Sequence, residues 1–112
     1  MIYLASPYSH EKAWVREFRY KKTYEFTRYC TMKGELIFSP VVYGHQFVEK
    51  DKAVISYSFW QPFNEHMILA CSEMRVLCLM GWKESKGVRA ELAFAEAHGM
   101  PITFAEPLNE NI

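Results

Sequence analysis

A glutamate near the start of a predicted helix, Glu91, has the residue type and the position best suited to catalysis. An apolar run at residues 74–80 comes before it, a loop follows at residues 81–87, and strong helix formers surround the glutamate. This order predicts a strand, a loop and a helix that begins near Ser85. A carboxylate roughly one and a half turns into that helix would face the cleft at the strand ends, where open α/β sheets bind ligands. We therefore expect Glu91 to be a nucleophile, although most helix glutamates are simply exposed to solvent.

The start of the same helix is a candidate seat for a phosphate group. Ser85 can supply a hydroxyl, and Lys86 and Gly87 can supply backbone N–H groups. A helix N-terminus carries unpaired N–H groups and a partial positive charge, and both attract anions. Serine is also a preferred N-cap residue, so it could serve the helix alone. The two roles are compatible because a bound phosphate can replace the cap.

The first predicted strand, residues 2–5, and the turn after it offer further candidates. Tyr3 could reach across the sheet and hydrogen-bond the carboxylate of Glu91, or it could be an ordinary core aromatic residue. His45 could line the same pocket, although a lone loop histidine is more often a surface residue. The turn combines hydroxyl groups with a proline that ends the strand, and we expect it to contact a ligand through Ser6, Pro7, Tyr8 and Ser9.

Strands and helices alternate along the chain, which predicts a parallel sheet with right-handed crossovers. The expected strands are residues 2–5, 35–38, 74–80 and 101–104, and the expected helices are residues 11–32, 59–72 and 85–98. Residues 41–58 mix aromatic, charged and glycine residues. We expect them to form a long loop with at most one helical turn, of the kind that often becomes a binding lid.

The composition predicts one globular domain that spans residues 1–112. Half of the residues are hydrophobic and 16% are aromatic, well above the content of a disordered chain. Thirteen basic residues balance thirteen acidic ones, so overall charge favours neither nucleic acid nor an anionic membrane as a partner. The apolar run at residues 1–5 is too short for a signal peptide or a membrane span. We expect a cytoplasmic protein.

The cysteines and the remaining histidines do not suggest a metal site. Three cysteines form an odd set without the spacing of a metal motif, and they suit small buried side chains in a reducing compartment. The histidines outside the expected site, His10, His66 and His98, make no recognisable ligand set. We expect neither a metal nor another cofactor.

Taken in this order, the motifs resemble the nucleoside 2-deoxyribosyltransferase-like superfamily, and in particular a branch of small bacterial and phage proteins. Residues 3–9, 38–41, 60–71 and 76–91 carry the resemblance. It implies a flavodoxin-like (Rossmann-like) three-layer sandwich with a parallel sheet of four to five strands, and cleavage of an N-glycosidic bond. In that family a glutamate at the position of Glu91 attacks the anomeric carbon and forms a covalent glycosyl-enzyme intermediate, which water or a second base resolves. The tyrosine that matches Tyr3 orients the nucleophile.

The residue six positions before the nucleophile helps to distinguish branches of this superfamily. Transferases that act on free nucleosides usually carry an aspartate there, and branches that hydrolyse nucleoside 5′-monophosphates usually carry a serine. This chain has Ser85. A carboxylate would repel a phosphate, whereas a hydroxyl at a helix N-terminus can donate to one. The resemblance therefore favours hydrolysis of a (2′-deoxy)nucleoside 5′-monophosphate.

The chain departs from the family pattern at Asn64 and Ser72, where relatives usually carry aspartates. The first of these aspartates handles the base or its proton in relatives. An asparagine at this catalytic position can hydrogen-bond a base but cannot transfer a proton. Either a neighbour such as Glu65 or His45 takes over, or the base leaves with little help, or activity is weak or lost.

Three other functions stay open at this point. One is a base-exchanging deoxyribosyltransferase, another is a nucleotide-sensing module without turnover, and the third is a structural oligomerisation domain. Superfamily relatives assemble as dimers or higher oligomers. We expect a homodimer or a higher homo-oligomer, because a chain this small cannot hide all of its aromatic residues, among them Trp14, Phe18, Tyr29, Phe59 and Trp60.

Overall fold

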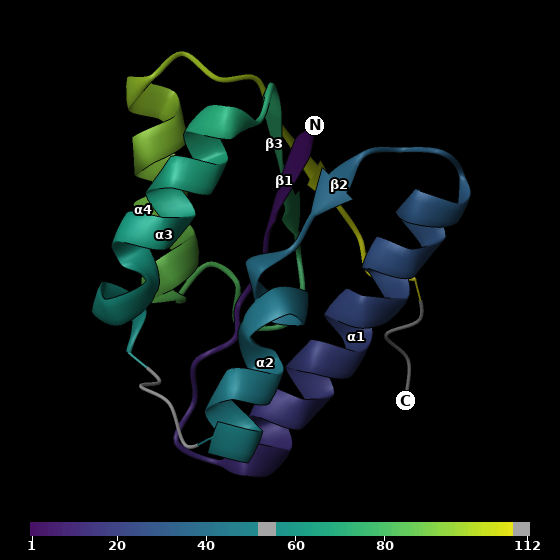
Figure 1. Cartoon of the computed structure of the whole chain (residues 1–112), viewed down its shortest axis with the longest axis vertical. Coiled ribbons are helices and arrows are strands. Elements are labelled where there is room, and N and C mark those ends of the chain that lie inside the picture. The colour runs from purple at the N-terminus through teal and green to yellow at the C-terminus, as the bar shows by residue number, and fades with distance from the viewer. Residues whose placement is uncertain (52–55, 109–112) are drawn as a thin grey trace.

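A computed structural model of the chain describes residues 1–51 and 56–108. The strands are β1 (Ile2–Ala5), β2 (Ile37–Phe38), β3 (Glu73–Leu77) and β4 (Ile102–Ala105). The helices are α1 (Ala13–Met32), α2 (Pro40–Asp51), α3 (Tyr57–Ala70) and α4 (Lys86–Ala97), and Figure 1 shows how they surround the strands. No helix in these two described segments is long and apolar enough to cross a membrane.

The four strands form one parallel sheet in the order β2-β1-β3-β4. Tyr3 of β1 lies opposite Phe38 of β2 and Met74 of β3. The chain leaves β1 for a neighbour on one side and then crosses to β3 on the other side. The carboxyl ends of β1 and β3 therefore flank the point where the strand order reverses, which is where doubly wound sheets bind ligands.

Side chains alternate between the two faces of the sheet, as the period of a strand requires. Residues of β1 and β3 such as Tyr3 and Val76 pack with α3 and α4, and the buried members of this cluster are Tyr3, Ala5, Ile68, Cys71, Met74, Val76, Val88 and Ala95. Their neighbours Leu4 and Leu77 point the other way and pack against Phe26 and Cys30 of α1. Figure 1 shows α1 on one side of the sheet and α3 and α4 on the other. The predicted flavodoxin-like α/β arrangement in three layers is confirmed.

Glycines end two of the helices where the sequence predicts a stop. Gly34 follows α1 with a φ of 93°, and Gly99 follows α4 with a φ of 67°. This left-handed conformation costs other residues energy because it brings the Cβ atom close to a carbonyl oxygen. Two of the three cysteines, Cys30 and Cys71, are buried as expected, and Cys78 is half-buried; all three are free thiols.

The prediction of a loop at residues 41–58 is wrong for most of that range, because Pro40–Asp51 forms helix α2. Ser39 Oγ accepts a hydrogen bond from the backbone N–H of Val42, and Pro40 occupies the first helical position, so the helix has a sound start. Its inner face carries Val41, Gly44, His45 and Val48 at helical spacing. The exposed positions include the aromatic residues Tyr43 and Phe47, which hides the amphipathic pattern in the sequence. Residues 52–55 of the expected loop lie outside the described residues.

Helix α3 also begins earlier than predicted, at Tyr57 instead of residue 59. Pro62 therefore lies inside the helix and not in its first turn. Helix α4 begins as predicted: Ser85 is its N-cap, and the serine Oγ accepts from the backbone N–H of Val88 at 3.2 Å.

Candidate active site

Three side chains from three different elements meet around one carboxylate oxygen. Tyr3 of β1 donates its phenolic hydrogen to Oε2 of Glu91 at 2.9 Å. Asn64 of α3 donates from Nδ2 to the same oxygen at 3.1 Å. Both hydrogen bonds are buried, and only 4% of Glu91 is exposed. The carboxylate is thus held in one orientation, and neither bond uses its other oxygen, Oε1.

Burial raises the pKa of Glu91 from 4.5 to about 8, against the opposing effect of the hydrogen bonds from Tyr3 and Asn64. Removal from water disfavours the charged form, whereas donors to the carboxylate favour it. Burial and the adjacent Glu91 carboxylate also raise the pKa of Tyr3 well above its usual value, so Tyr3 stays a hydrogen-bond donor. A carboxylate with a strongly perturbed pKa in a cleft is typical of a functional site.

This pKa predicts a pH dependence for any reaction in which Glu91 attacks as an anion. Because its folded-state pKa is raised to about 8, the carboxyl group is mostly protonated at pH 6 and ionises as the pH rises. For a substrate whose leaving group needs no proton, we expect kcat/KM to rise by about tenfold per pH unit up to roughly pH 8 and then to level off. Initial rates over a series of substrate concentrations, measured at each pH and at constant ionic strength, give this profile. A plateau that already begins near pH 5 would contradict it.

Asn64 has an unused acceptor beside the Glu91 carboxylate. Its Oδ1 is the one buried side-chain nitrogen or oxygen in residues 1–51 and 56–108 that lacks a hydrogen-bond partner. Only 5% of the residue is exposed, and it lines the cavity described below. A buried unpaired acceptor is costly, typically about 1–3 kcal/mol. The amide is therefore suited to accept from a donor group of a ligand.

The cavity has a volume of about 720 Å³ and opens at the carboxyl ends of the strands. The turn after β1, helix α2 and the first two turns of α3 form part of its wall, and the first two turns of α4 form the rest. Of the predicted site residues, it is lined by Ser6, Tyr8, Ser9, His45, Asn64, Ser85, Lys86, Gly87 and Glu91. This volume fits a small-molecule ligand.

Residues 1–106 match the model of a protein family that is described as a domain of unknown function, DUF1937. The chain belongs to the DUF1937 family. The matched segment contains Tyr3, Asn64 and Glu91 as well as the whole wall of the cavity. Curated proteins contain no match to the chain.

Two predicted site residues of this DUF1937 chain lie differently from the prediction. Pro7 is fully buried and is not part of the cavity wall, because its ring packs into the protein beneath the turn. His45 lies in the wall, but on helix α2 and 95% buried instead of on a loop. Its Nδ1 is 2.7 Å from the hydroxyl of Tyr8, and its Nε2 is 3.0 Å from Oε1 of Glu17.

Tyr57 is a cavity residue that the sequence analysis missed, because its segment was expected to be a loop. Its ring lies so close to Gly87 that a Cβ atom on the glycine would be 3.1 Å from Cδ1. Burial and the nearby Glu91 carboxylate raise the pKa of Tyr57. A glycine at this position thus lets an aromatic ring approach the first turn of α4.

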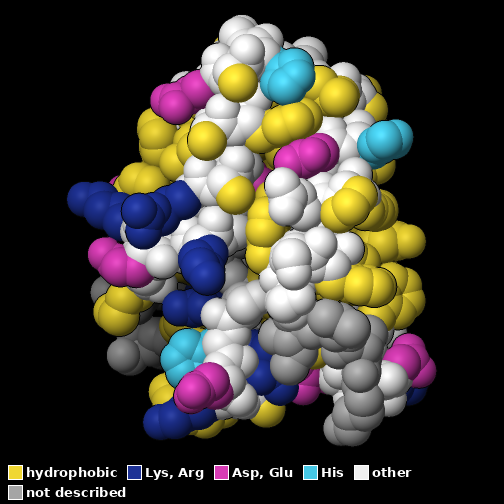
Figure 2. Space-filling view, turned by 90° about the vertical axis from the view of Figure 1, so that its left-hand side faces the viewer, with side chains coloured by type: hydrophobic (Ala, Val, Ile, Leu, Met, Phe, Trp, Pro, Cys, Tyr) yellow, Lys and Arg dark blue, Asp and Glu magenta, His cyan; other side chains and the backbone are white. Residues whose placement is uncertain are grey.

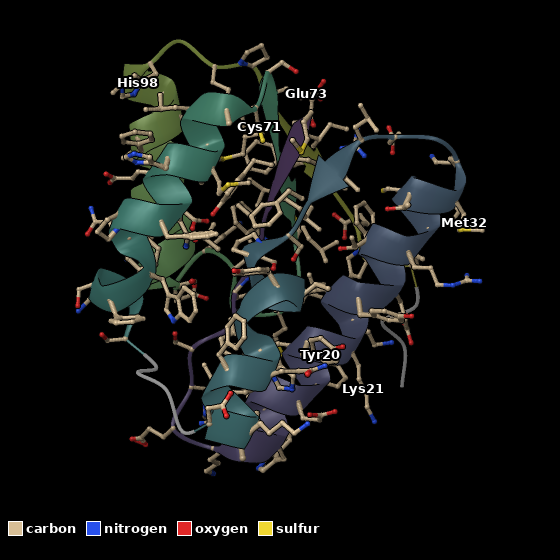
Figure 3. All side chains as sticks on the ribbon, in the orientation of Figure 1. Tyr20, Lys21, Met32, Cys71, Glu73 and His98 are labelled. Atoms are coloured by element: carbon tan, nitrogen blue, oxygen red, sulfur yellow. The ribbon has the colours of Figure 1, made fainter. Side chains whose placement is uncertain are left out.

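The remaining polar candidates of the DUF1937 chain lie outside the site. Glu65 accepts from Gln61 Nε2 at 2.8 Å and does not line the cavity. Figure 3 places His98 at the far end of α4, and its Nδ1 contacts the carbonyl oxygen of Phe94 at 2.9 Å. Among the described residues, His, Cys, Asp and Glu do not gather in groups of three or more that could hold a metal ion.

Proposed function

We propose that this protein is an N-glycosidase that hydrolyses the base–sugar bond of a (2′-deoxy)nucleoside 5′-monophosphate. The observation that carries the proposal is the buried carboxylate of Glu91, held through Oε2 by Tyr3 and Asn64 at the wall of a ligand-sized cavity. Glu91 and Tyr3 also match the resemblance to the nucleoside 2-deoxyribosyltransferase-like superfamily, whereas Asn64 stands where that family usually has an aspartate. Site chemistry and the resemblance thus favour one reaction.

In the first half of the reaction, Oε1 of Glu91 attacks the anomeric carbon from the face opposite the base. The carbon–nitrogen bond breaks as the carbon–oxygen bond forms, and its electron pair leaves with the base. The product is a glycosyl ester of the glutamate. Tyr3 and Asn64 keep their hydrogen bonds to Oε2, so the attacking oxygen stays aimed throughout.

In the second half, water attacks the same carbon and the glutamate leaves as a carboxylate. Two displacements retain the configuration of the sugar, as in retaining glycosidases. A second nucleobase in place of water would give base exchange instead. The two reactions differ only in whether water or a nucleobase attacks the glycosyl-enzyme intermediate.

The first turn of α4 supports a nucleotide over a nucleoside. Ser85 and Gly87 line the cavity with the N-terminal N–H groups of α4, and Lys86 adds a positive charge at the rim. Six residues of helix separate Ser85 from Glu91, a rise of about 9 Å, and helical side chains point back toward the N-terminus. One helix therefore presents both an anion seat and the nucleophile to the same cavity.

The unused acceptor of Asn64 is relevant to whether the substrate sugar carries a 2′-hydroxyl. The attacking carboxylate must approach the face opposite the base, and a ribose 2′-hydroxyl projects from that same face. Asn64 is hydrogen-bonded to the carboxylate, so its Oδ1 could accept from such a hydroxyl. Ribonucleotides and deoxyribonucleotides therefore have to be compared directly.

The test is release of free base from a panel of ribo- and deoxyribonucleoside 5′-monophosphates and the matching nucleosides. Hydrolysis of the nucleotides supports the proposal, and the absence of release from every substrate rejects it. A second free base added to the reaction separates the alternatives, because only a transferase forms the exchanged nucleotide. A nucleotide-sensing module would instead gain thermal stability with a nucleotide and release no base.

We also propose that the protein forms a homodimer, with the exposed aromatic side chains of α2 and α3 in its interface. Tyr43, Phe47 and Phe59 are 50%, 39% and 56% exposed, and their rings belong to one contact network through Phe63 and Trp60. Figure 2 shows hydrophobic side chains on the right-hand side of the view, where α3 lies. The aromatic residues named from the sequence do not form one patch. Some lie on α1 and others on α3, and these two helices cover opposite faces of the sheet (Figure 1).

Size-exclusion chromatography with light scattering tests the dimer at micromolar concentration. We expect a dimer for the wild type and a monomer for the double variant Phe47→Ser, Phe59→Ser, because exposed aromatic area drives association. Trp14→Ser on α1 is the matched control, since Trp14 is 68% exposed and lies on the other side of the sheet. A monomeric wild type would reject the dimer.

A further inference from the structure

The imidazole of His45 lies between a phenol and a carboxylate. Its Nδ1 is 2.7 Å from the Tyr8 hydroxyl, and its Nε2 is 3.0 Å from Oε1 of Glu17. The ring of Tyr20 stacks on the imidazole with the centroids 4.1 Å apart, and Figure 3 shows Tyr20 on the side of α1 next to α2. Three elements therefore fix the histidine: the turn after β1, helix α1 and helix α2.

This row of groups connects the cavity to solvent. Tyr8 and His45 line the same cavity as Glu91, whereas the Glu17 side chain is 48% exposed. Burial and the nearby Glu49 carboxylate raise the pKa of Tyr8, so the phenol keeps its proton until a specific partner takes it. A proton can enter at the exposed carboxylate and leave at the cavity wall.

The histidine has two protonation states, and each prepares Tyr8 for a different task. When His45 is an imidazolium, Nδ1–H donates to the Tyr8 oxygen, and the phenolic hydrogen can turn to a ligand or to the nearby Glu49 carboxylate. When His45 is neutral with its proton on Nε2, Tyr8 donates to Nδ1, and a lone pair of the phenol is available to accept. Glu17 accepts from Nε2–H in both states.

The proposed reaction needs a proton at the leaving base, and Tyr8 is a phenol of the cavity wall that a hydrogen-bonded histidine can reprotonate. Asn64 has no proton to transfer, and Glu65 does not line the cavity and is hydrogen-bonded to Gln61. We propose that Tyr8 is the catalytic acid and base of the proposed N-glycosidase, with His45 and Glu17 as the relay that resupplies it. The inference rests on the proposed function and names the residue that moves the proton.

The steps balance in both halves of the reaction. As the carbon–nitrogen bond breaks and Glu91 bonds to the sugar, the base nitrogen takes the phenolic proton of Tyr8, and the Tyr8 oxygen takes the Nδ1 proton of His45. In the second half, attacking water gives a proton to the Tyr8 oxygen while Tyr8 returns its own proton to Nδ1. The carbon–oxygen bond to Glu91 breaks, and the site is restored. One group thus serves as acid and then as base, as in retaining glycosidases.

The variant Tyr8→Phe tests this role with two leaving bases. The first substrate is a nucleoside monophosphate that the wild type cleaves. The second carries a better leaving base of the same class, 7-methylguanine for a purine or 5-fluorouracil for a pyrimidine, which needs less help from an acid. Base release in a single turnover with excess enzyme measures the first step alone.

We expect Tyr8→Phe to slow release of the ordinary base by about 100-fold or more. The loss of rate with the better leaving base should be at least tenfold smaller. Glu17→Gln should show the same pattern with a smaller loss. Tyr24→Phe is the matched control on α1, because it removes a phenol outside the relay, and it should change neither rate. Thermal melting confirms that each variant is folded.

Two results would overturn the relay while the proposed function stands. One is an equal loss on both substrates, which would indicate a structural role for Tyr8. The other is an unchanged rate for Tyr8→Phe with either base. If the wild type releases no base from any nucleotide, the proposed function is rejected and the relay with it.

Discussion

Glu91→Gln is expected to lower base release by at least about 10⁴-fold, because an amide cannot form the glycosyl ester. The substitution is nearly isosteric, and the amide oxygen can still accept from Tyr3 and Asn64. The loss should therefore fall on kcat, with little change in substrate affinity. Mass spectrometry of the quenched wild-type reaction should show one added phosphoribosyl or phosphodeoxyribosyl group, and the variant should show none. Turnover close to that of the wild type would reject Glu91 as the nucleophile.

The same variant should be more stable than the wild type, and increasingly so at higher pH. The folded-state pKa of Glu91 is raised from 4.5 to about 8 by burial, so the folded protein binds this proton more tightly than the unfolded chain does. Ionisation of Glu91 therefore costs stability progressively between about pH 4.5 and pH 8, and the full cost applies above that range. We expect Glu91→Gln to gain roughly 2–4 kcal/mol at pH 9 and much less at pH 5.

Denaturant unfolding at the two pH values measures this difference. The combination of lost activity and gained stability separates a catalytic carboxylate from a structural one. A structural carboxylate would lose stability when its hydrogen bonds are weakened. A variant that is less stable at both pH values would contradict a buried Glu91 whose ionisation destabilises the fold.

Ser85→Asp should reverse the preference between nucleotide and nucleoside. Aspartate is as good an N-cap as serine, so its carboxylate can still accept from the backbone N–H of Val88, and α4 should keep its start. The new charge would face the phosphate, however. Two like charges about 4 Å apart repel by about 4 kcal/mol at an effective dielectric constant of 20, close to a 1,000-fold loss. We expect this loss in kcat/KM for the 5′-monophosphate and little or none for the matching nucleoside.

Ser85→Asn is the matched control, because asparagine caps a helix equally well and carries no charge. It should keep most of the activity on the nucleotide. Activity assays on nucleotide and nucleoside pairs, with thermal melting of each variant, provide the readout. An unchanged kcat/KM for the nucleotide in Ser85→Asp would show that the phosphate does not bind at the start of α4.

The sequence predicts the parts of the site that depend on local order. The run of apolar residues followed by a serine and strong helix formers is sufficient to predict β3, the cap at Ser85 and the start of α4. The position of Glu91 along α4 can be predicted as well, because the number of residues between it and the N-cap fixes that position. These features arise from hydrogen bonds and side-chain contacts within a few residues, which periodicity and capping rules describe.

Helix α2 shows where local rules fail. Its exposed face carries Tyr43 and Phe47, so hydrophobicity does not separate an inner face from an outer one. The structure shows the inner face, because Val41, His45 and Val48 are buried. The expected lid is consequently a helix that forms a fixed wall of the cavity and positions the imidazole beside Tyr8.

By itself, the sequence determined the four strands, the helices α1, α3 and α4, the capped start of α4 and the candidate nucleophile on it. Only the tertiary structure decided that Glu91 is buried and meets Tyr3 and Asn64, which lie 88 and 27 residues away along the chain. It also decided that His45 joins Tyr8 to Glu17 across three elements. The physical reason is that burial and long-range hydrogen bonds depend on how the sheet and helices pack, and no pattern of neighbouring residues records that packing.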